Sequence, residues 1–374
     1  MIAKDPQPGR KIDVEAKLAG CAAILGLAFA ASAQAGIVDM PNGDFSATGN
    51  AGSVGGGLLT PSASNVPIGP DGGPWKGNYA GALGVLAPPS LTIDAAAGTA
   101  TISGIAGLSV GGIISNGGSF SQALPLAYEA NKRYTVWTDV DVGETLALDL
   151  LADTNVGVAF TSGGSVLASS ATAATGLVDL SLLNGDTYRL TFVHDTGASV
   201  NGNVGIALFD QPAGLLTASL IGGVSFGHVG LNVGAITDAT TQMHVSGFGS
   251  LSAEVNTPFE GTLKALVTDA NGNPLEGVII NADAPGSGAS AVLSSQLDTG
   301  ISVRAVTGSD GIAEIGATAN AIAGCYKVTA SLPGSTAKAV FNLRNWSVED
   351  MAAFSARGIV PYLLQDSIFC DGYE

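Results

Sequence analysis

The chain has 374 residues and a formal net charge of −17, with 14 Lys and Arg against 31 Asp and Glu. Charged residues make up 12% of it, about half the usual ~25%, while 46% is hydrophobic and 53 residues are Gly. The excess of acidic over basic residues excludes a nucleic-acid-binding protein, which needs a basic surface. The high hydrophobic content excludes a disordered acidic tail.

Residues 1–35 have the pattern of a secretory signal peptide. Four basic residues precede a short apolar run at 22–31, and residues 33–35 are Ala-Gln-Ala, which signal peptidase accepts. The run is shorter than the ~20 apolar residues of a spanning helix. No later stretch reaches that length without Gly, Pro or charge. We therefore expect cleavage after residue 35, no transmembrane segment, and a secreted or cell-surface location.

Cys21 offers an alternative, because it follows Leu-Ala-Gly as in a lipoprotein lipobox. In lipoproteins the apolar run precedes the Cys, whereas here it follows, and residues 12–17 before the Cys include charges. The sequence favours cleavage over lipidation.

Residues 36–236 predict a first all-β unit with a jelly-roll-like sandwich fold. Residues 36–89 are rich in Gly and Pro and favour long loops around one or two strands. Asn184-Gly185 between alternating runs is a hairpin signal, and eight to ten strands suit a jelly roll. Strands are predicted at 90–94, 99–103, 133–140, 145–151, 156–161, 165–169, 177–182, 187–193, 205–209 and 223–233.

Residues 237–242 are polar and predict a linker. Residues 243–345 then predict a second sandwich of about seven strands, the size of an immunoglobulin-like domain. Its predicted strands include 262–268, 278–282, 301–306, 312–315, 326–332 and 337–343.

Residues 346–374 predict a short helix and an extended tail. Ser347 and Asp350 have the spacing of a capping box, and Gly358 is a stop signal.

The second unit contains a series of motifs in order, which are VSGFGSLSAEVNTPF at 245–259, LVTDANGNPLEGV at 266–278, APGSGAS at 284–290, TGSDGI at 307–312 and TANAIAGCYKVTA at 318–330. Over about 243–345 these motifs resemble bacterial Ig-like domains of the Big-1, invasin/intimin type. The resemblance implies a non-catalytic spacer or adhesive module on bacterial surface and secreted proteins.

Cys325 departs from that family, which usually carries Ser or Thr there. After cleavage Cys325 and Cys370 are the remaining cysteines, and in an oxidising compartment an even pair is a disulfide candidate. The alternative is two separate buried thiols.

In the first unit, Asn42-Gly43-Asp44-Phe45 is followed downstream by Trp75. This layout resembles the opening of jelly-roll carbohydrate-binding and galactose-binding-like modules. Sugar binding needs aromatic platforms with nearby polar groups. We therefore predict ligand contact at Trp75, Asn78 and Tyr79, whereas Trp137 fits a core position on a strand.

Such modules often hold a structural calcium ion, for which Asp44 and Asp210 are the candidate ligands. No other cofactor is expected. Catalysis has little support from the sequence. His194-Asp195 is an adjacent pair for which the sequence identifies no nucleophile, and His228 and His244 are too isolated for a zinc site with recognisable spacing.

These observations predict an exported, non-enzymatic protein. Its first unit would bind glycan or extracellular matrix, and the Ig-like unit would act as a spacer. The alternatives are a structural subunit of a surface layer or fibre without a small ligand and, third, an extracellular polysaccharide hydrolase.

Overall fold

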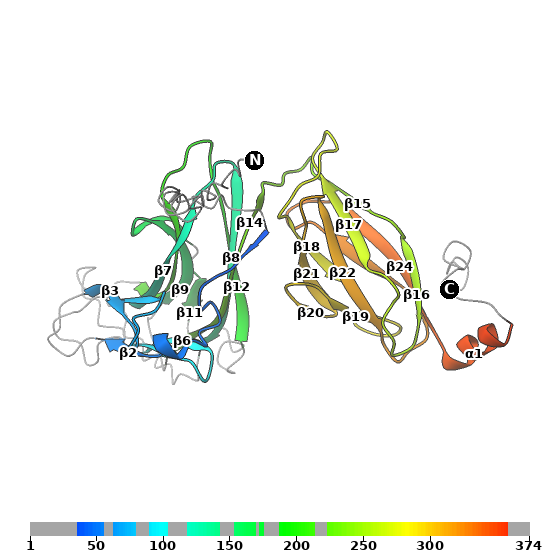
Figure 1. Cartoon of the computed structure of the whole chain (residues 1–374), viewed down its shortest axis with the longest axis horizontal. Coiled ribbons are helices and arrows are strands. Elements are labelled where there is room, and N and C mark those ends of the chain that lie inside the picture. Colours follow the sequence, from blue (N-terminus) through cyan, green and yellow to red (C-terminus); the bar gives the residue numbers. More distant parts are fainter. Residues whose placement is uncertain are drawn as a thin grey trace, which may run out of the picture.

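The computed structural model describes residues 36–55, 63–79, 90–103, 118–142, 153–169, 172–175, 187–213 and 223–357. The predicted signal peptide, the strands predicted at 145–151 and 177–182, the Asn184-Gly185 turn and Cys370 lie outside these ranges. Within the described residues the chain forms β-sheets and one short α-helix (Figure 1). The prediction of an all-β sandwich fold is confirmed.

The first unit consists of two antiparallel sheets. Sheet A has the order β12 (Thr187–Asp195), β8 (Lys132–Val142), β14 (Val224–Ala235), β6 (Thr99–Ser103), β5 (Ser90–Asp94) and β2 (Gly52–Gly55), with β1 (Gly36–Val38) paired to β14. Sheet B has the order β10 (Ser165–Ser169), β9 (Asp153–Ser162), β13 (Asn203–Ala213), β7 (Gly118–Ala127), β4 (Lys76–Tyr79) and β3 (Ala63–Pro67), with β11 (Thr172–Thr175) paired to β9.

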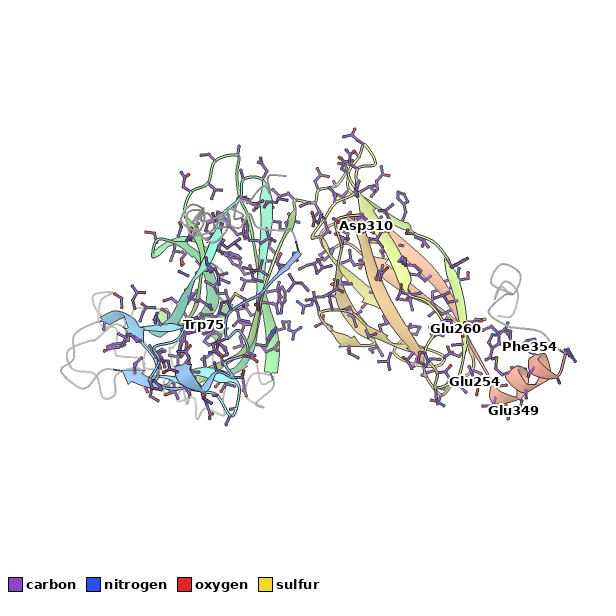
Figure 2. The ribbon with its side chains drawn as sticks, viewed as in Figure 1. Trp75, Glu254, Glu260, Asp310, Glu349 and Phe354 are labelled. Carbon is purple, nitrogen blue, oxygen red and sulfur yellow. The ribbon has the colours of Figure 1, made fainter. Side chains whose placement is uncertain are left out.

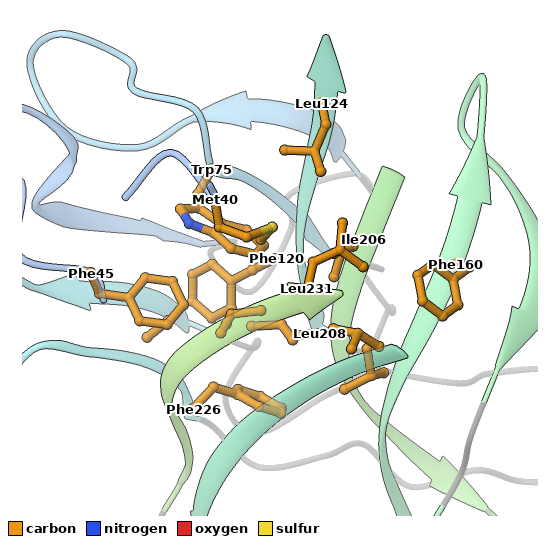
Figure 3. Close-up of a cluster of buried hydrophobic side chains, with 14 of the residues drawn as sticks. Met40, Phe45, Trp75, Phe120, Leu124, Phe160, Ile206, Leu208, Phe226 and Leu231 are labelled. Carbon is orange, nitrogen blue, oxygen red and sulfur yellow. The ribbon is translucent and has the colours of Figure 1, made fainter. Parts of the chain in front are cut away.

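The core of the first unit lies between these two sheets. Successive side chains of a strand point to opposite faces, so every second residue of a strand faces this core. On β8 the buried set includes Tyr134, Val136 and Val140, and on β13 it includes Ile206 and Leu208. Figure 3 shows Ile206 and Leu208 in one cluster with Phe120, Phe226 and Leu231. Burial of each such side chain stabilises the fold by roughly 1.5–3 kcal/mol.

The Asn42-Gly43-Asp44-Phe45 motif closes one end of this core. Asn42 and Phe45 have φ values of 50° and 57°, in the left-handed region, which is rare for a bulky aromatic residue. This turn places the Phe45 ring 5.3 Å from the Trp75 ring (Figure 3). The Trp75 Nε1–H donates to the Asn42 carbonyl oxygen at 2.9 Å. Asn50, which is 1% exposed, donates through Nδ2 to the Ile68 carbonyl at 2.9 Å.

The second unit is also a sandwich. Sheet C has the order β15 (Gln242–Val245), β17 (Leu263–Thr268), β22 (Ile312–Ala319), β19 (Ala291–Ser294) and β20 (Thr299–Gly300). Sheet D has the order β16 (Ser250–Glu254), β24 (Lys338–Trp346), β23 (Gly324–Ser331), β18 (Ile279–Asp283) and β21 (Ser302–Val306), in which β16 runs parallel to β24. The core between them includes Leu263, Ile280, Leu293, Ile315 and Phe341.

The segment between the units is a hydrogen-bonded turn. Asp238 Oδ1 accepts from the backbone N–H of Thr240 at 2.8 Å, and Thr241 Oγ1 accepts from the Asp238 N–H at 3.0 Å. Gln242, which the sequence places in the linker, already belongs to β15. The connection is therefore an ordered corner.

The helix α1 (Val348–Ala356) follows β24 directly. Ser347 is its N-cap and accepts the backbone N–H of Asp350 at 3.1 Å, as the capping spacing predicted. Phe354 packs edge-on against Trp346, with ring centroids 4.9 Å apart. Within the described residues, no helix has the length and apolarity needed to cross a membrane.

We expect Trp75→Ala to lower the free energy of unfolding of the first unit by about 3–5 kcal/mol, because it empties a fully buried site and removes the bond to Asn42. Urea unfolding followed by circular dichroism measures this. Phe248→Ala is the matched control, because Phe248 is 66% exposed and its loss should change stability by less than about 0.5 kcal/mol. Equal effects at both positions would contradict the structural role of Trp75.

Candidate functional site

The second unit covers part of the outer face of sheet A, around Trp137 on β8 and Asn232 and Gly234 on β14. Trp137 on β8 points away from the core of the first unit and is nevertheless only 2% exposed. Its indole lies against Gly230 of β14, where a Cβ atom would overlap the ring. From β21 of the second unit, the guanidinium carbon of Arg304 lies 5.0 Å from the ring centroid. The sequence prediction that Trp137 is buried in the core of its own sandwich therefore needs correction, because the second unit buries it.

A chain of ion pairs crosses between the units beside Trp137. Arg189 of β12 contacts Asp139 at 2.7 Å and Asp298 of the second unit at 2.8 Å. Asp298 also pairs with Arg304 at 2.8 Å. Burial acts to raise the pKa of Asp298, but the hydrogen bonds from Arg304 and Arg189 outweigh it and lower the pKa to about 2. The shared carboxylate is thus charged at neutral pH and joins two arginines from different units.

The backbones of the units also meet directly. The Ala235 N–H donates to the Glu276 carbonyl at 3.0 Å, and Asn232 Nδ2 donates to the Gly277 carbonyl at 2.8 Å. A Cβ at Gly234 would overlap the Gly277 backbone. We call this contact region the junction, defined by Trp137, Arg189, Asn232 and Gly234 of the first unit and Gly277, Asp298 and Arg304 of the second.

A cleft of about 540 Å³ opens beside the junction and is named here the polar cleft. It lies between the segment after β1, the outer face of sheet A and the loop before β20. Its charged and polar lining includes side chains that donate and accept hydrogen bonds. These are Asp39, Asn42, Asp44, Arg189, His228 and Gln296, together with the edge of Trp137.

A β-bulge directs His228 into the polar cleft. The register between β14 and β8 shifts between Phe226 and Val229, and His228 is exposed within this bulge. Bulges re-aim side chains and are frequent beside functional sites. The sequence analysis predicted no site role for His228, because no partner residue lies near it in the sequence. The glycine before it, in an otherwise alternating strand, is the signal that could have indicated the bulge.

The predicted ligand contact at Trp75 is wrong. Trp75 is fully buried and lies inside the first unit (Figure 2). Its indole N–H is already bonded to a backbone carbonyl, so neither its ring face nor its polar group is available to a sugar. The turn-rich segment around it indicated an exposed loop, but the left-handed turn at Phe45 folds that segment over the core.

Asn78 and Tyr79 hold strands together and do not line the polar cleft. Asn78 Nδ2 donates to Ser121 Oγ at 2.9 Å, and its Oδ1 accepts from the Asn65 N–H at 2.8 Å. These bonds link β4 to β7 and β3. Tyr79 is partly buried against the hydrophobic core.

The two predicted calcium ligands, Asp44 and Asp210, lie in different parts of the first unit. Asp44 lines the polar cleft and is bonded to Ser46, which lowers the pKa of its carboxyl. Asp210 follows the inward-facing Ile206 and Leu208 on β13 of sheet B and is 9% exposed. The structure does not assemble a calcium site from this pair. The described residues contain no group of three or more His, Cys, Asp or Glu that could hold a metal ion.

Cys325 on β23 takes part in a disulfide. Its expected partner, Cys370, lies outside the described residues, so the pairing remains a prediction.

We expect Gly234→Ala to separate the units, because the new Cβ would overlap the Gly277 carbonyl oxygen. Small-angle X-ray scattering should record a larger maximum dimension, and Trp137 should become accessible to a fluorescence quencher. Gly286→Ala is the matched control, because nothing lies within 4 Å of a Cβ at that position. Unchanged scattering for Gly234→Ala would refute the close contact.

Because Asp210 is buried, we expect the free energy of unfolding to depend on pH. Burial raises its pKa from 3.8 to about 7, and Oδ1 has no partner in the described part of the chain. Between pH 4 and 7 the unfolded chain ionises while the folded protein keeps the proton, so the free energy of unfolding falls as pH rises, by up to about 1.4 kcal/mol per unit. Asp210→Asn should therefore be more stable than wild type at pH 8 and should lose this advantage towards pH 4.

Urea unfolding at pH 4, 6 and 8 measures that difference. The exposed carboxylate of Glu260 provides the comparison Glu260→Gln. An equal pH-dependent gain in both variants would contradict an origin in burial.

Comparison with known proteins gives distant structural likenesses. No family model and no curated protein matches the chain. A Stig cyclase, Fisc, from Fischerella sp. TAU is similar over 55% of this chain and 100% of its own, at 16% identity and a TM-score of 0.34. The CBM22-1–CBM22-2 tandem domain of Xyn10C from Paenibacillus barcinonensis is similar over 78% of this chain and 92% of its own, at 11% identity and a TM-score of 0.26. These likenesses are too distant to transfer a function.

Proposed function

We propose that the protein is an exported, non-catalytic bacterial surface or secreted protein that binds glycan or extracellular matrix in the polar cleft. The observation that carries this proposal is the cleft itself, with carboxylate, imidazole, guanidinium and amide groups around a space of about 540 Å³. This volume falls within the roughly 300–1,000 Å³ of small-molecule sites.

The mixture of groups favours a hydroxylated ligand. A hydroxyl both donates and accepts a hydrogen bond, so it can bond to Asp39 or Asp44 in one direction and to Arg189 in the other. A nucleic acid or another polyanion would meet the two carboxylates and be repelled.

A binding role agrees with the histidine environment better than a hydrolytic one. His244 is hydrogen-bonded to Gln242 at 3.2 Å and not to a hydroxyl nucleophile. His228 is exposed on the bulge, where it can bond to a ligand. In this proposal His228 is a binding residue.

The second unit acts as a rigid arm rather than a loose spacer. The ion pairs and the backbone contacts of the junction fix it against sheet A. It also contributes Gln296 and Leu297 to the wall of the polar cleft. The proposal retains a Big-1-type origin for this unit and export through the leader at 1–35, both of which the sequence motivates.

One observation favours the alternative of a structural subunit in a layer or fibre. β10 lies at an edge of sheet B and exposes Val166 at 63% and Leu167 at 43%. An exposed hydrophobic edge strand is a template for pairing with another chain. Ordered polymers in electron micrographs at rising protein concentration, without glycan binding, would support this alternative over the first.

A glycan array with purified residues 36–374 tests the proposal. Wild type should bind a defined subset of glycans, and His228→Ala should weaken binding roughly three- to tenfold, the range expected for loss of one hydrogen bond. His244→Ala is the matched control, because His244 is an exposed histidine outside the cleft. No binding by wild type, or equal binding by both variants, would count against the polar cleft as the glycan site.

A further inference from the structure

The described part of the chain contains a reactive dipeptide, Asn followed by Gly, at three places. These pairs are Asn42-Gly43, Asn201-Gly202 and Asn271-Gly272, whereas Asn116-Gly117 and Asn184-Gly185 lie outside the described residues. Gly has no Cβ atom to keep its backbone nitrogen away from the side-chain carbon Cγ of the preceding Asn. That nitrogen can displace the side-chain amide where the fold leaves both groups free to react.

Hydrogen bonds hold both groups at the first pair. The Gly43 N–H donates to the Met40 carbonyl at 3.0 Å. Asn42 Oδ1 accepts from the Ala47 N–H at 2.8 Å, and Asn42 Nδ2 donates to Asn50 Oδ1 at 3.3 Å. The attacking nitrogen and the amide that it would displace are therefore both engaged.

The turn between β17 and β18 holds the third pair. The Gly272 N–H donates to the Asp269 carbonyl at 3.1 Å. The Asp269 carboxylate also fixes this turn, because its Oδ1 accepts from the backbone N–H groups of Asn271 and Asn273, each at 2.8 Å. Attack on Asn271 would first have to break the hydrogen bond of the Gly272 nitrogen.

The second pair is free at the same atoms. Asn201 and Gly202 are exposed in the connection between β12 and β13. Among the described residues, neither the Asn201 side-chain amide nor the Gly202 N–H has a hydrogen-bond partner. Only the carbonyls are bonded, to the Tyr128 N–H at 2.9 Å for Gly202 and to Ser162 Oγ at 3.1 Å for Asn201. The fold also requires a glycine here, because φ is +90° and a Cβ atom would overlap Ser162 Oγ.

The Ser162 hydroxyl favours attack by the Gly202 nitrogen. The Asn201 carbonyl and the Gly202 N–H belong to one peptide unit, so loss of the N–H proton places negative charge on the carbonyl oxygen. Ser162 Oγ donates to that oxygen, and a hydrogen bond to the charged form of a group favours that form. The bond therefore makes the nitrogen easier to deprotonate.

We propose that Asn201-Gly202 is a self-modification site that deamidates through a succinimide, while Asn42 and Asn271 stay intact in the folded protein. The Gly202 nitrogen bonds to Asn201 Cγ, and the bond from Cγ to Nδ2 breaks. The proton lost by Gly202 reaches Nδ2 through solvent, so the leaving group departs as ammonia. Water then opens the ring at either carbonyl and gives aspartate or isoaspartate. The sum is one water consumed and one ammonia released, without an oxidant or a cofactor.

The product changes the charge and the backbone of this connection. It adds a carboxylate to a chain whose net charge is already −17, and isoaspartate also adds a methylene group to the backbone. The pairing of β13 with β7 already shifts register between Asn203 and Gly205, directly after the site. This irregularity can absorb the added atom, so we expect the modified protein to stay folded. The modification is independent of the proposed glycan binding.

Peptide mapping by mass spectrometry tests the proposal on the purified protein, aged at pH 8 in heavy-oxygen water. Asn201 and Asn271 are matched, because each begins the tripeptide Asn-Gly-Asn. In the folded protein Asn201 should gain label roughly three- to tenfold faster than Asn271, the range for one hydrogen bond that must break, and should yield isoaspartate. In urea the two rates should converge. Equal rates in the folded protein, or labelling without isoaspartate, would overturn the proposal.

Three variants separate the steps. Asn201→Gln should abolish labelling at that position, because its longer side chain cannot form the five-membered ring. Asp269→Ala should raise the rate at Asn271 towards that at Asn201, because it removes the carboxylate that fixes the turn. Ser162→Ala should slow the reaction at Asn201 roughly three- to tenfold through loss of one hydrogen bond. An unchanged rate at Asn271 in Asp269→Ala, or an unchanged or faster rate at Asn201 in Ser162→Ala, would overturn the hydrogen-bond basis of the proposal.

Discussion

The close approach of Gly234 and Gly277 is the constraint on which the arrangement of this molecule depends. Neither position has space for a side chain, and the absence of Cβ atoms lets two backbones touch. That contact brings the Gly277 carbonyl to Asn232 and places Arg304 over Trp137. The polar cleft beside the junction is bounded by both units because the sheets meet at this separation. A wider separation would leave an open gap without converging polar groups.

The core of the first unit depends on a different local device, the left-handed turn that buries Phe45. Holding an aromatic residue at positive φ is unfavourable by itself. The surrounding bonds offset that cost, since Asn42 accepts from Trp75 and Asn50 ties the Ile68 and Trp75 backbones together. The motif that resembles the opening of sugar-binding modules therefore acts here as a structural anchor.

Hydrophobic alternation predicted much of the fold but not all of it. The strands β5, β6 and β10 have the bounds expected from the sequence. β7 was not predicted, because Gln122 occupies an inward position and Pro125 interrupts the run. Gln122 is tolerated there because its Nε2 donates to the Pro41 carbonyl at 3.1 Å, a long-range contact that no local pattern contains.

Sequence patterns did not predict the candidate site, because it too depends on contacts between residues far apart in the sequence. The sequence predicted a core position for Trp137, because no local pattern indicates that another unit covers the outer face of β8. The polar cleft combines residues between Ile37 and Asp44 with residues of β8, β12 and β14 and with the loop at Gln296. Such a set becomes visible only when the relative position of the two sandwiches is known.

A strand with both faces covered has a consequence for evolution. β8 contributes Val136 to one core and Trp137 to the contact with the neighbouring unit. Gene rearrangements usually shuffle modules whose surfaces are complete without a neighbour. Without the second unit, the first unit would expose Trp137 on the outer face of β8. We therefore expect the two units to be inherited together.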